Sequence, residues 1–158
     1  MLPSGLLALV LLAAPAGPAA GPSGSAAASP APGARAQGEA FALELVVPSA
    51  KPGAAATAQV VLVARGPYHV NRDYPASFRP DAASTARLAG TRVPLGEGAA
   101  RTPCKDFPGE TCSVSWPLPF TAAASGETRI AGVVSFSVCN PDRCLIEKVS
   151  VAAVVPSR

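Results

Sequence analysis

The sequence predicts an all-β fold, an immunoglobulin-like antiparallel β-sandwich, from three observations. Short runs rich in β-branched residues recur through the second part of the chain, with turn residues between them. The 18 Pro and 14 Gly residues interrupt every stretch long enough for a helix of three turns. Seven or eight short strands in roughly 120 residues are typical of such a sandwich, although the Cys-Trp-Cys spacing of a true immunoglobulin domain is absent.

The first 38 residues predict two segments that precede the folded domain. Residues 1–20 have an apolar run from Leu6 to Leu12 followed by small residues, which is typical of a signal peptide. That run is far shorter than the roughly 20 residues that cross a bilayer, so we expect export without an anchor. Residues 21–38 consist almost entirely of Gly, Pro, Ala and Ser, and they predict a disordered linker.

The folded domain is expected over residues 39–158, where turn signals such as Lys51-Pro52-Gly53 separate the candidate strands. In chain order the candidate runs, two of them weak, are residues 41–47, 57–63, 68–71, 76–79, 87–89, 91–95, 113–116, 128–138 and 144–155. Each is short, rich in β-branched residues, or alternates polar with apolar positions. The runs at 87–89 and 91–95 are the weakest of them.

The charge of this domain argues against a nucleic-acid partner. The whole chain has 13 basic and 10 acidic side chains, and only Arg35 precedes residue 39, which leaves 12 against 10 with the two signs interspersed. His69 is the single histidine, and no serine stands in a nucleophile-elbow context, so a His-dependent triad is not expected. We expect a monomer with no cofactor.

Cys139 and Cys144 are predicted to form a disulfide across a hairpin. The intervening residues 140–143, Asn-Pro-Asp-Arg, suit a turn with Asn first and Pro second, where the fixed φ of Pro is already correct. The two cysteines would then face each other at a separation that a disulfide can close. From spacing alone, a structural staple and a redox pair are equally acceptable.

Cys104 and Cys112 form the second predicted pair, around a loop that Pro108-Gly109 would turn sharply. Either small ring contributes about 2 to 3 kcal/mol of stability, so stability does not separate a staple from a redox pair. A zinc site is the competing use of four thiols. It is disfavoured, since neither pair has the two-residue spacing common in zinc ribbons and export favours oxidised cysteines.

Three segments together resemble the N-terminal periplasmic domain of the thiol:disulfide interchange protein DsbD. Residues 136–145 followed by a final strand are similar to its redox hairpin, residues 66–71 with Tyr74-Pro75 to its early aromatic-rich strand, and residues 105–109 to its cap loop. The resemblance extends over roughly residues 41–155. Its motifs are short, and their order and spacing make the match.

The resemblance implies an immunoglobulin-like fold and a periplasmic redox cycle. Cys144 would form the mixed disulfide with a partner and Cys139 would resolve it, which agrees with exchange through a mixed-disulfide intermediate. The implied partners are thioredoxin-fold periplasmic proteins and a separate, membrane-embedded electron donor. The resemblance also implies site roles for a cap loop of Asp106, Phe107, Pro108 and Gly109, with Phe107 as the shield, and for the surrounding Tyr68, His69 and Asn71.

Two classes of function therefore stay open. The first is a thiol:disulfide oxidoreductase of the protein-disulfide reductase type, with Cys104 and Cys112 as an additional structural disulfide. The second is a non-enzymatic exported binding or structural module in which both disulfides are inert. Within the loop, Asp106 and Glu110 could tune a thiol by charge, but solvated loop carboxylates are the commoner case.

Overall fold

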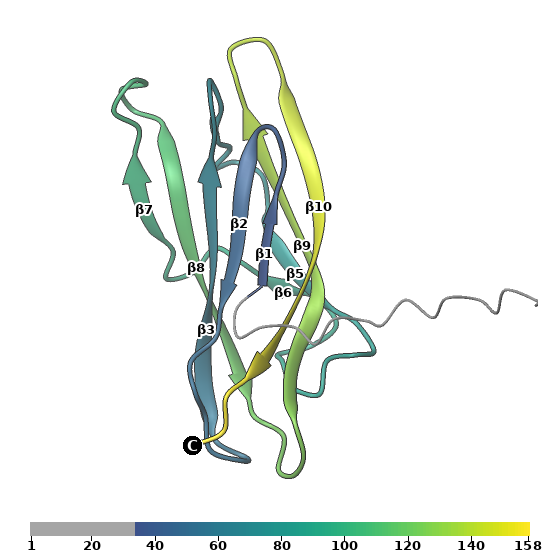
Figure 1. Cartoon of the computed structure of the whole chain (residues 1–158). Coiled ribbons are helices and arrows are strands. Elements are labelled where there is room, and N and C mark those ends of the chain that lie inside the picture. Colours follow the sequence, from purple (N-terminus) through teal and green to yellow (C-terminus); the bar gives the residue numbers. More distant parts are fainter. Residues whose placement is uncertain (1–33) are drawn as a thin grey trace, which may run out of the picture.

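The computed structural model describes residues 34–158, so the expected signal peptide and most of the expected linker lie outside the described residues. The described chain contains strands and turns and no helix (Figure 1). The strands are β1 (Ala34–Gln37), β2 (Phe41–Val46), β3 (Ala55–Ala64), β4 (His69–Val70), β5 (Ser77–Pro80), β6 (Val93–Pro94), β7 (Ala100–Pro103), β8 (Thr111–Thr121), β9 (Thr128–Cys139) and β10 (Cys144–Val155). The all-β prediction is confirmed.

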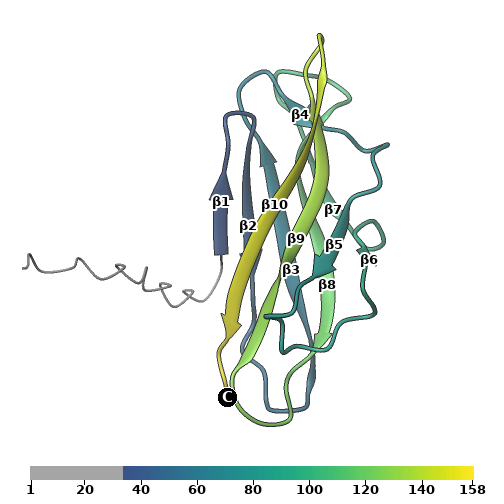
Figure 2. The ribbon, with the colours of Figure 1, turned by 90° about the vertical axis from the view of Figure 1, so that its right-hand side faces the viewer.

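Every pair of named strands is antiparallel, and the hydrogen-bonded order is β1-β2-β3-β8-β4-β9-β5-β6, with β10 on β9 and β7 on β8. The short strand β4 connects the two halves of this order, because it pairs with both β8 and β9. Figures 1 and 2 show β1, β2, β3, β8 and β7 on one side of the molecule and β10, β9, β5 and β6 on the other. This arrangement is consistent with an immunoglobulin-like fold.

The core lies between these two groups of strands. Alternate residues of β2, β3 and most of β8 are buried, which is the period-2 pattern of strands with one apolar face, whereas β9 is buried at most of its positions. The ring of Phe41 on β2 meets that of Phe136 on β9 edge to face, with centroids 5.0 Å apart, although the two strands do not pair. Trp116 and Phe120 are buried in the same core, as expected.

Gly132 in the middle of β9 allows β5 to approach closely. A Cβ at this position would collide with the backbone carbonyl of Arg79 and would lie 2.7 Å from Cζ of Phe78. Glycine within a strand commonly marks such a close approach. This contact fixes the position of β5 against β9, and the positions of the β5 residues discussed below depend on it.

The linker prediction is wrong at its C-terminal end, because residues 34–37 form β1 against β2. Ala34 and Ala36 are half-buried, and Arg35 makes a 3.0 Å ion pair with Glu44 of β2. Local composition predicted disorder here. The preformed edge of β2 supplies the hydrogen bonds and the apolar contacts that this segment cannot supply by itself.

Two further differences concern β7 and β8. Strand β7 was not predicted, because all of its residues are exposed and show no apolar alternation. Strand β8 extends beyond the predicted residues 113–116 and continues through Pro117 and Pro119. In this part of β8 the backbone N–H groups of odd-numbered residues point away from β3; the Thr121 N–H, for example, donates to the Arg87 carbonyl. Pro117 and Pro119 lack an N–H, but they occupy such positions, so no hydrogen bond between β8 and β3 is lost.

Candidate functional site

Both predicted disulfides are present, and no described cysteine is free. Cys139 and Cys144 face each other at the tip of the β9–β10 hairpin, with Cα atoms 4.0 Å apart. The turn between them closes as predicted. The Asn140 N–H donates to the Arg143 carbonyl at 2.9 Å, and the Asn140 side-chain oxygen accepts from the N–H groups of Asp142 and Arg143.

The two cysteines of this hairpin differ in access. Cys139 is buried, with 7% of its surface exposed, whereas Cys144 is exposed to solvent. An open hollow of about 440 Å³ adjoins the pair and is lined by side chains from β4 and the residues after it, from Glu110, and from the hairpin itself. A disulfide exchange partner can therefore approach Cys144 more easily than Cys139.

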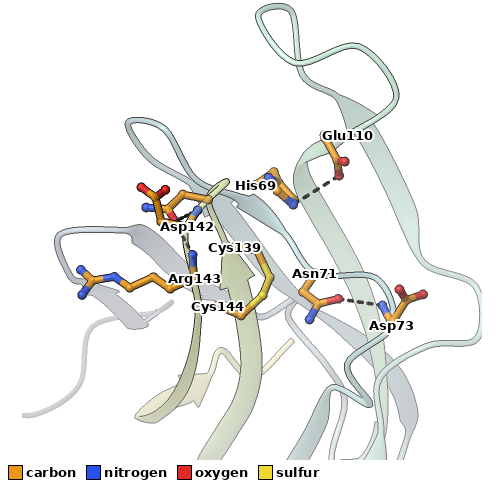
Figure 3. The surroundings of a disulfide bond; sticks show 9 residues. His69, Asn71, Asp73, Glu110, Cys139, Asp142, Arg143 and Cys144 are labelled. Carbon is orange, nitrogen blue, oxygen red and sulfur yellow. Dashed lines mark hydrogen bonds and ion pairs between the residues drawn. A yellow bond between two sulfur atoms is a disulfide. The ribbon is translucent and has the colours of Figure 1, made fainter.

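His69 lies beside Cys139 on the same face of the sheet. The two residues are register partners in the β4–β9 pair, a position that places Cβ atoms about 4.5 to 5.5 Å apart. The His69 side chain is 20% exposed, and its Nε2 lies 3.4 Å from Oε2 of Glu110 (Figure 3). An imidazole in this position can exchange a proton with, or balance the charge of, a Cys139 thiolate.

Glu110 is held in place by the loop that the second disulfide closes. The Glu110 N–H donates to the Phe107 carbonyl at 3.1 Å across Pro108-Gly109, and Gly109 has a φ of +88°. Pro second and a positive-φ Gly third define a type II turn. The Cys104 N–H donates to the Glu110 carbonyl at 2.9 Å, so the disulfide, the turn and the carboxylate form one unit.

Of the residues 104–112, only Glu110 lines the hollow beside Cys139 and Cys144. Phe107 is half-buried within its own loop, and Asp106, Pro108 and Gly109 are exposed. The loop thus reaches the surroundings of the β9–β10 hairpin through a carboxylate in this structure. A shielding role for Phe107 stays a prediction.

Tyr68 and Asn71 support the hairpin from the two ends of β4. The buried Tyr68 accepts a hydrogen bond on its hydroxyl from Nη2 of Arg143 at 3.3 Å. This hydrogen bond is the main reason that the pKa of Arg143 is raised above its ordinary value. The Asn71 N–H donates to the Ser137 carbonyl at 3.0 Å, and its side-chain oxygen accepts from the Asp73 N–H at 3.1 Å.

Ser137 is a feature of the site that the sequence did not suggest. It lies two residues before Cys139 on the same face of β9, is 2% exposed, and its hydroxyl has no hydrogen-bond partner among the described protein atoms. Buried hydroxyls are normally paired. Its strand position alone predicts that it shares a face with Cys139, but nothing local predicts its burial.

Comparisons with protein-family models, curated proteins and solved structures find no match to this chain. No helix long and apolar enough to span a membrane occurs within residues 34–158. The functional argument therefore depends on the geometry of the hairpin and its neighbours. That geometry combines an exposed cysteine, a buried cysteine bonded to it, and an adjacent imidazole with a carboxylate partner.

Proposed function

We propose that this domain is a thiol:disulfide interchange protein in which the Cys139–Cys144 bond is made and broken during each cycle. The unequal exposure of the two cysteine residues beside an open hollow is the observation that carries the proposal. Disulfide exchange requires one sulfur that a partner can reach and a second that attacks the resulting mixed disulfide. Cys144 suits the first role and Cys139 the second.

The reaction proceeds in two displacements that balance. The Cys144 thiolate of the reduced domain attacks a partner disulfide, forming a mixed disulfide and releasing one partner thiolate, which takes up a proton. The Cys139 thiolate then attacks the Cys144 sulfur and releases the second partner thiolate, which is protonated in turn. The partner gains two electrons and two protons, and Cys139–Cys144 is oxidised.

His69 and Glu110 assist the second displacement. When protonated, the imidazole beside Cys139 can stabilise the thiolate form of that cysteine, and Glu110, whose Oε2 lies 3.4 Å from the His69 Nε2, orients the ring. His69 is a candidate to accept the proton of the Cys139 thiol before it attacks. Since Glu110 belongs to the loop of the second disulfide, Cys104–Cys112 acts as a positioning element.

The location and partners belong to the same proposal. The apolar run within residues 1–20 supports export, and an oxidising compartment supports two disulfides in a small domain. The resemblance of residues 136–145 to the DsbD hairpin supports a periplasmic location, thioredoxin-fold acceptors and a membrane-embedded donor that reduces the domain again. A non-enzymatic exported module with two inert disulfides is the competing function.

The equilibrium reduction potential of Cys139–Cys144 tests this proposal against its competitor. We expect a value within about −120 to −270 mV, the range of disulfide oxidoreductases. A potential below about −300 mV would identify a structural staple and overturn the proposal. The measurement equilibrates the domain with redox buffers and quantifies the alkylated thiols of each pair by mass spectrometry, so that Cys104–Cys112 serves as an internal control.

Trapping tests the assignment of the two roles. In a Cys139→Ala variant Cys144 has no resolving partner, so mixed disulfides with proteins of a periplasmic extract should accumulate. The matched Cys144→Ala variant leaves only the less exposed Cys139 and should form few adducts. Equal or reversed yields would show that the roles are assigned incorrectly.

A further inference from the structure

The face of the β10–β9–β5 sheet that points away from the core connects the redox hairpin to a group of cations. Residues paired across antiparallel strands point to the same face, and that face recurs every second residue. The register therefore defines four rows: Cys144-Cys139-His69, Ile146-Ser137, Lys148-Ser135-Ser77 and Ser150-Val133-Arg79. None of their members belongs to the hydrophobic core cluster, and Figure 2 shows β10, β9 and β5 side by side.

The end of this face distant from the cystine is cationic. A hollow of about 390 Å³ there is lined by Arg79, Arg92 and Lys148, with the hydroxyl-bearing side chains of Tyr74, Ser77 and Ser135. Arg92 Nε donates to Ser77 Oγ at 3.2 Å, which anchors one of the three cations. The lining includes no carboxylate.

These three cations have no ionic partner within the described residues. The ion pairs found over residues 34–158 involve Arg35 with Glu44 and His69 with Glu110. The residues before Ala34 contain no Asp or Glu, so that segment offers no carboxylate either. Like charges gathered without a counter-charge raise the local affinity for anions.

An apolar side chain stands between the cystine and the cations. Ile146 is 62% exposed, more than any other large hydrophobic residue within residues 34–158. It shares its face with Cys144 on one side and Lys148 on the other. At about 3.3 Å per residue, Cys144 and Lys148 lie roughly 13 Å apart along β10.

We propose that this face, from Cys144 through Ile146 to Arg79, Arg92 and Lys148, is the docking surface for an acidic segment of the redox partner. The inference rests on the proposed function. A partner whose disulfide is attacked by Cys144 must lie against the neighbouring rows, where it meets first an apolar contact and then unpaired cations. A small anion is too short to span roughly 13 Å from the hollow to the cystine, so the occupant is a polypeptide with carboxylates.

The test uses synthetic peptides that carry one intramolecular disulfide. In the acidic peptide two Glu residues lie about four residues from the attacked cysteine, which matches the roughly 13 Å spacing in an extended chain. The neutral peptide has Gln at those positions. The second-order rate of oxidation of the reduced domain should be about tenfold higher with the acidic peptide at low ionic strength, and the difference should vanish near 0.5 M salt.

Charge reversal locates the effect. Arg79→Glu/Lys148→Glu should remove the preference for the acidic peptide and leave the rate with the neutral peptide within about twofold. Lys51→Glu/Arg101→Glu changes the net charge equally at exposed positions that do not line this hollow, and it should keep most of the preference. Equal rates with the two peptides, or equal losses in both variants, would overturn the proposed surface.

Two controls separate failure of docking from failure of the redox function. Exchange with uncharged 2-hydroxyethyl disulfide reports the redox reaction alone, and charge reversal should leave it unchanged. If the domain exchanges with no disulfide, the proposed function fails. Docking is then measured as binding of the acidic peptide, with Ser in place of its Cys residues, to the oxidised domain by fluorescence anisotropy. A dissociation constant unchanged by Arg79→Glu/Lys148→Glu would reject the surface independently.

Discussion

The two hairpins that end in disulfides use the same covalent bond in different surroundings. The β9–β10 hairpin is paired without a register shift from Cys144 to Val155, and its cystine closes a tight turn at the tip. The β7–β8 hairpin has a register shift between Thr102 and Pro103, and its cystine closes the longer loop that contains the type II turn. The first cystine ends a rigid ladder, and the second clamps a loop.

Access separates the two bonds more clearly than ring size does. Cys104 is 7% exposed and Cys112 is half-buried, so both residues of the loop pair are less exposed than Cys144. The two disulfides are nevertheless linked through side chains, because the loop places Glu110 against His69, which lies beside Cys139. Under the proposed function, one disulfide reacts while the other holds the groups that assist it.

The largest expected effect concerns the exchange reaction itself. Cys144→Ser should lower the rate of disulfide exchange by about a hundredfold or more, because the attacking sulfur is lost. Cys104→Ala/Cys112→Ala should keep the rate within about tenfold of the parent, measured with the same peptide disulfide. A folded loop variant that loses exchange as completely as Cys144→Ser would contradict the division of roles.

Stability should not distinguish the two bonds. Removing either pair by Ala substitution should lower the free energy of unfolding by about 2 to 3 kcal/mol, because each bond closes a small ring in the unfolded chain. Urea denaturation followed by Trp116 fluorescence measures this. If removal of the hairpin pair had no effect while removal of the loop pair did, the hairpin bond would be strained in the native state, and the comparison would have to be revised.

The link between the two hairpins predicts a smaller kinetic effect. Glu110→Gln should slow exchange by about threefold to tenfold, because His69 beside Cys139 loses the charged partner that lies 3.4 Å from its Nε2. Asp106→Asn is the matched control: it is an exposed carboxylate of the same loop, outside the hollow, and should change little. In the Cys104→Ala/Cys112→Ala background the effect of Glu110→Gln should shrink, and a full effect there would refute positioning by the loop disulfide.

The smallest expected effect concerns the unpaired hydroxyl of Ser137 near the tip of the β9–β10 hairpin. Ser137→Ala should leave the free energy of unfolding unchanged or raise it by about 1 kcal/mol, because no hydrogen bond is lost. Ser77→Ala removes the acceptor for Arg92 and should lower it by about 1 kcal/mol. Thermal unfolding of the oxidised proteins gives both values. A loss of stability in Ser137→Ala equal to that in Ser77→Ala would mean that the hydroxyl has a partner in solution.

The sequence by itself determined the features that depend on neighbours along the chain. Alternation of apolar residues predicts the long strands, and turn chemistry predicts both hairpin ends. The disulfide pairs followed from the same local reasoning, since their cysteines are separated by only 5 and 8 residues. The wrong linker end and the missed β7 lacked such a local pattern, because Ala34–Gln37 and Ala100–Pro103 form strands against a partner's edge.

Only the tertiary structure decided which distant residues share the site. His69 meets Cys139, and Glu110 meets His69, through pairings between strands far apart in sequence. The same long-range register brings Arg79 and Arg92 to the face that carries Lys148 and Cys144. Register between distant strands is set by the packing of the whole core, and the composition of any one segment does not contain it.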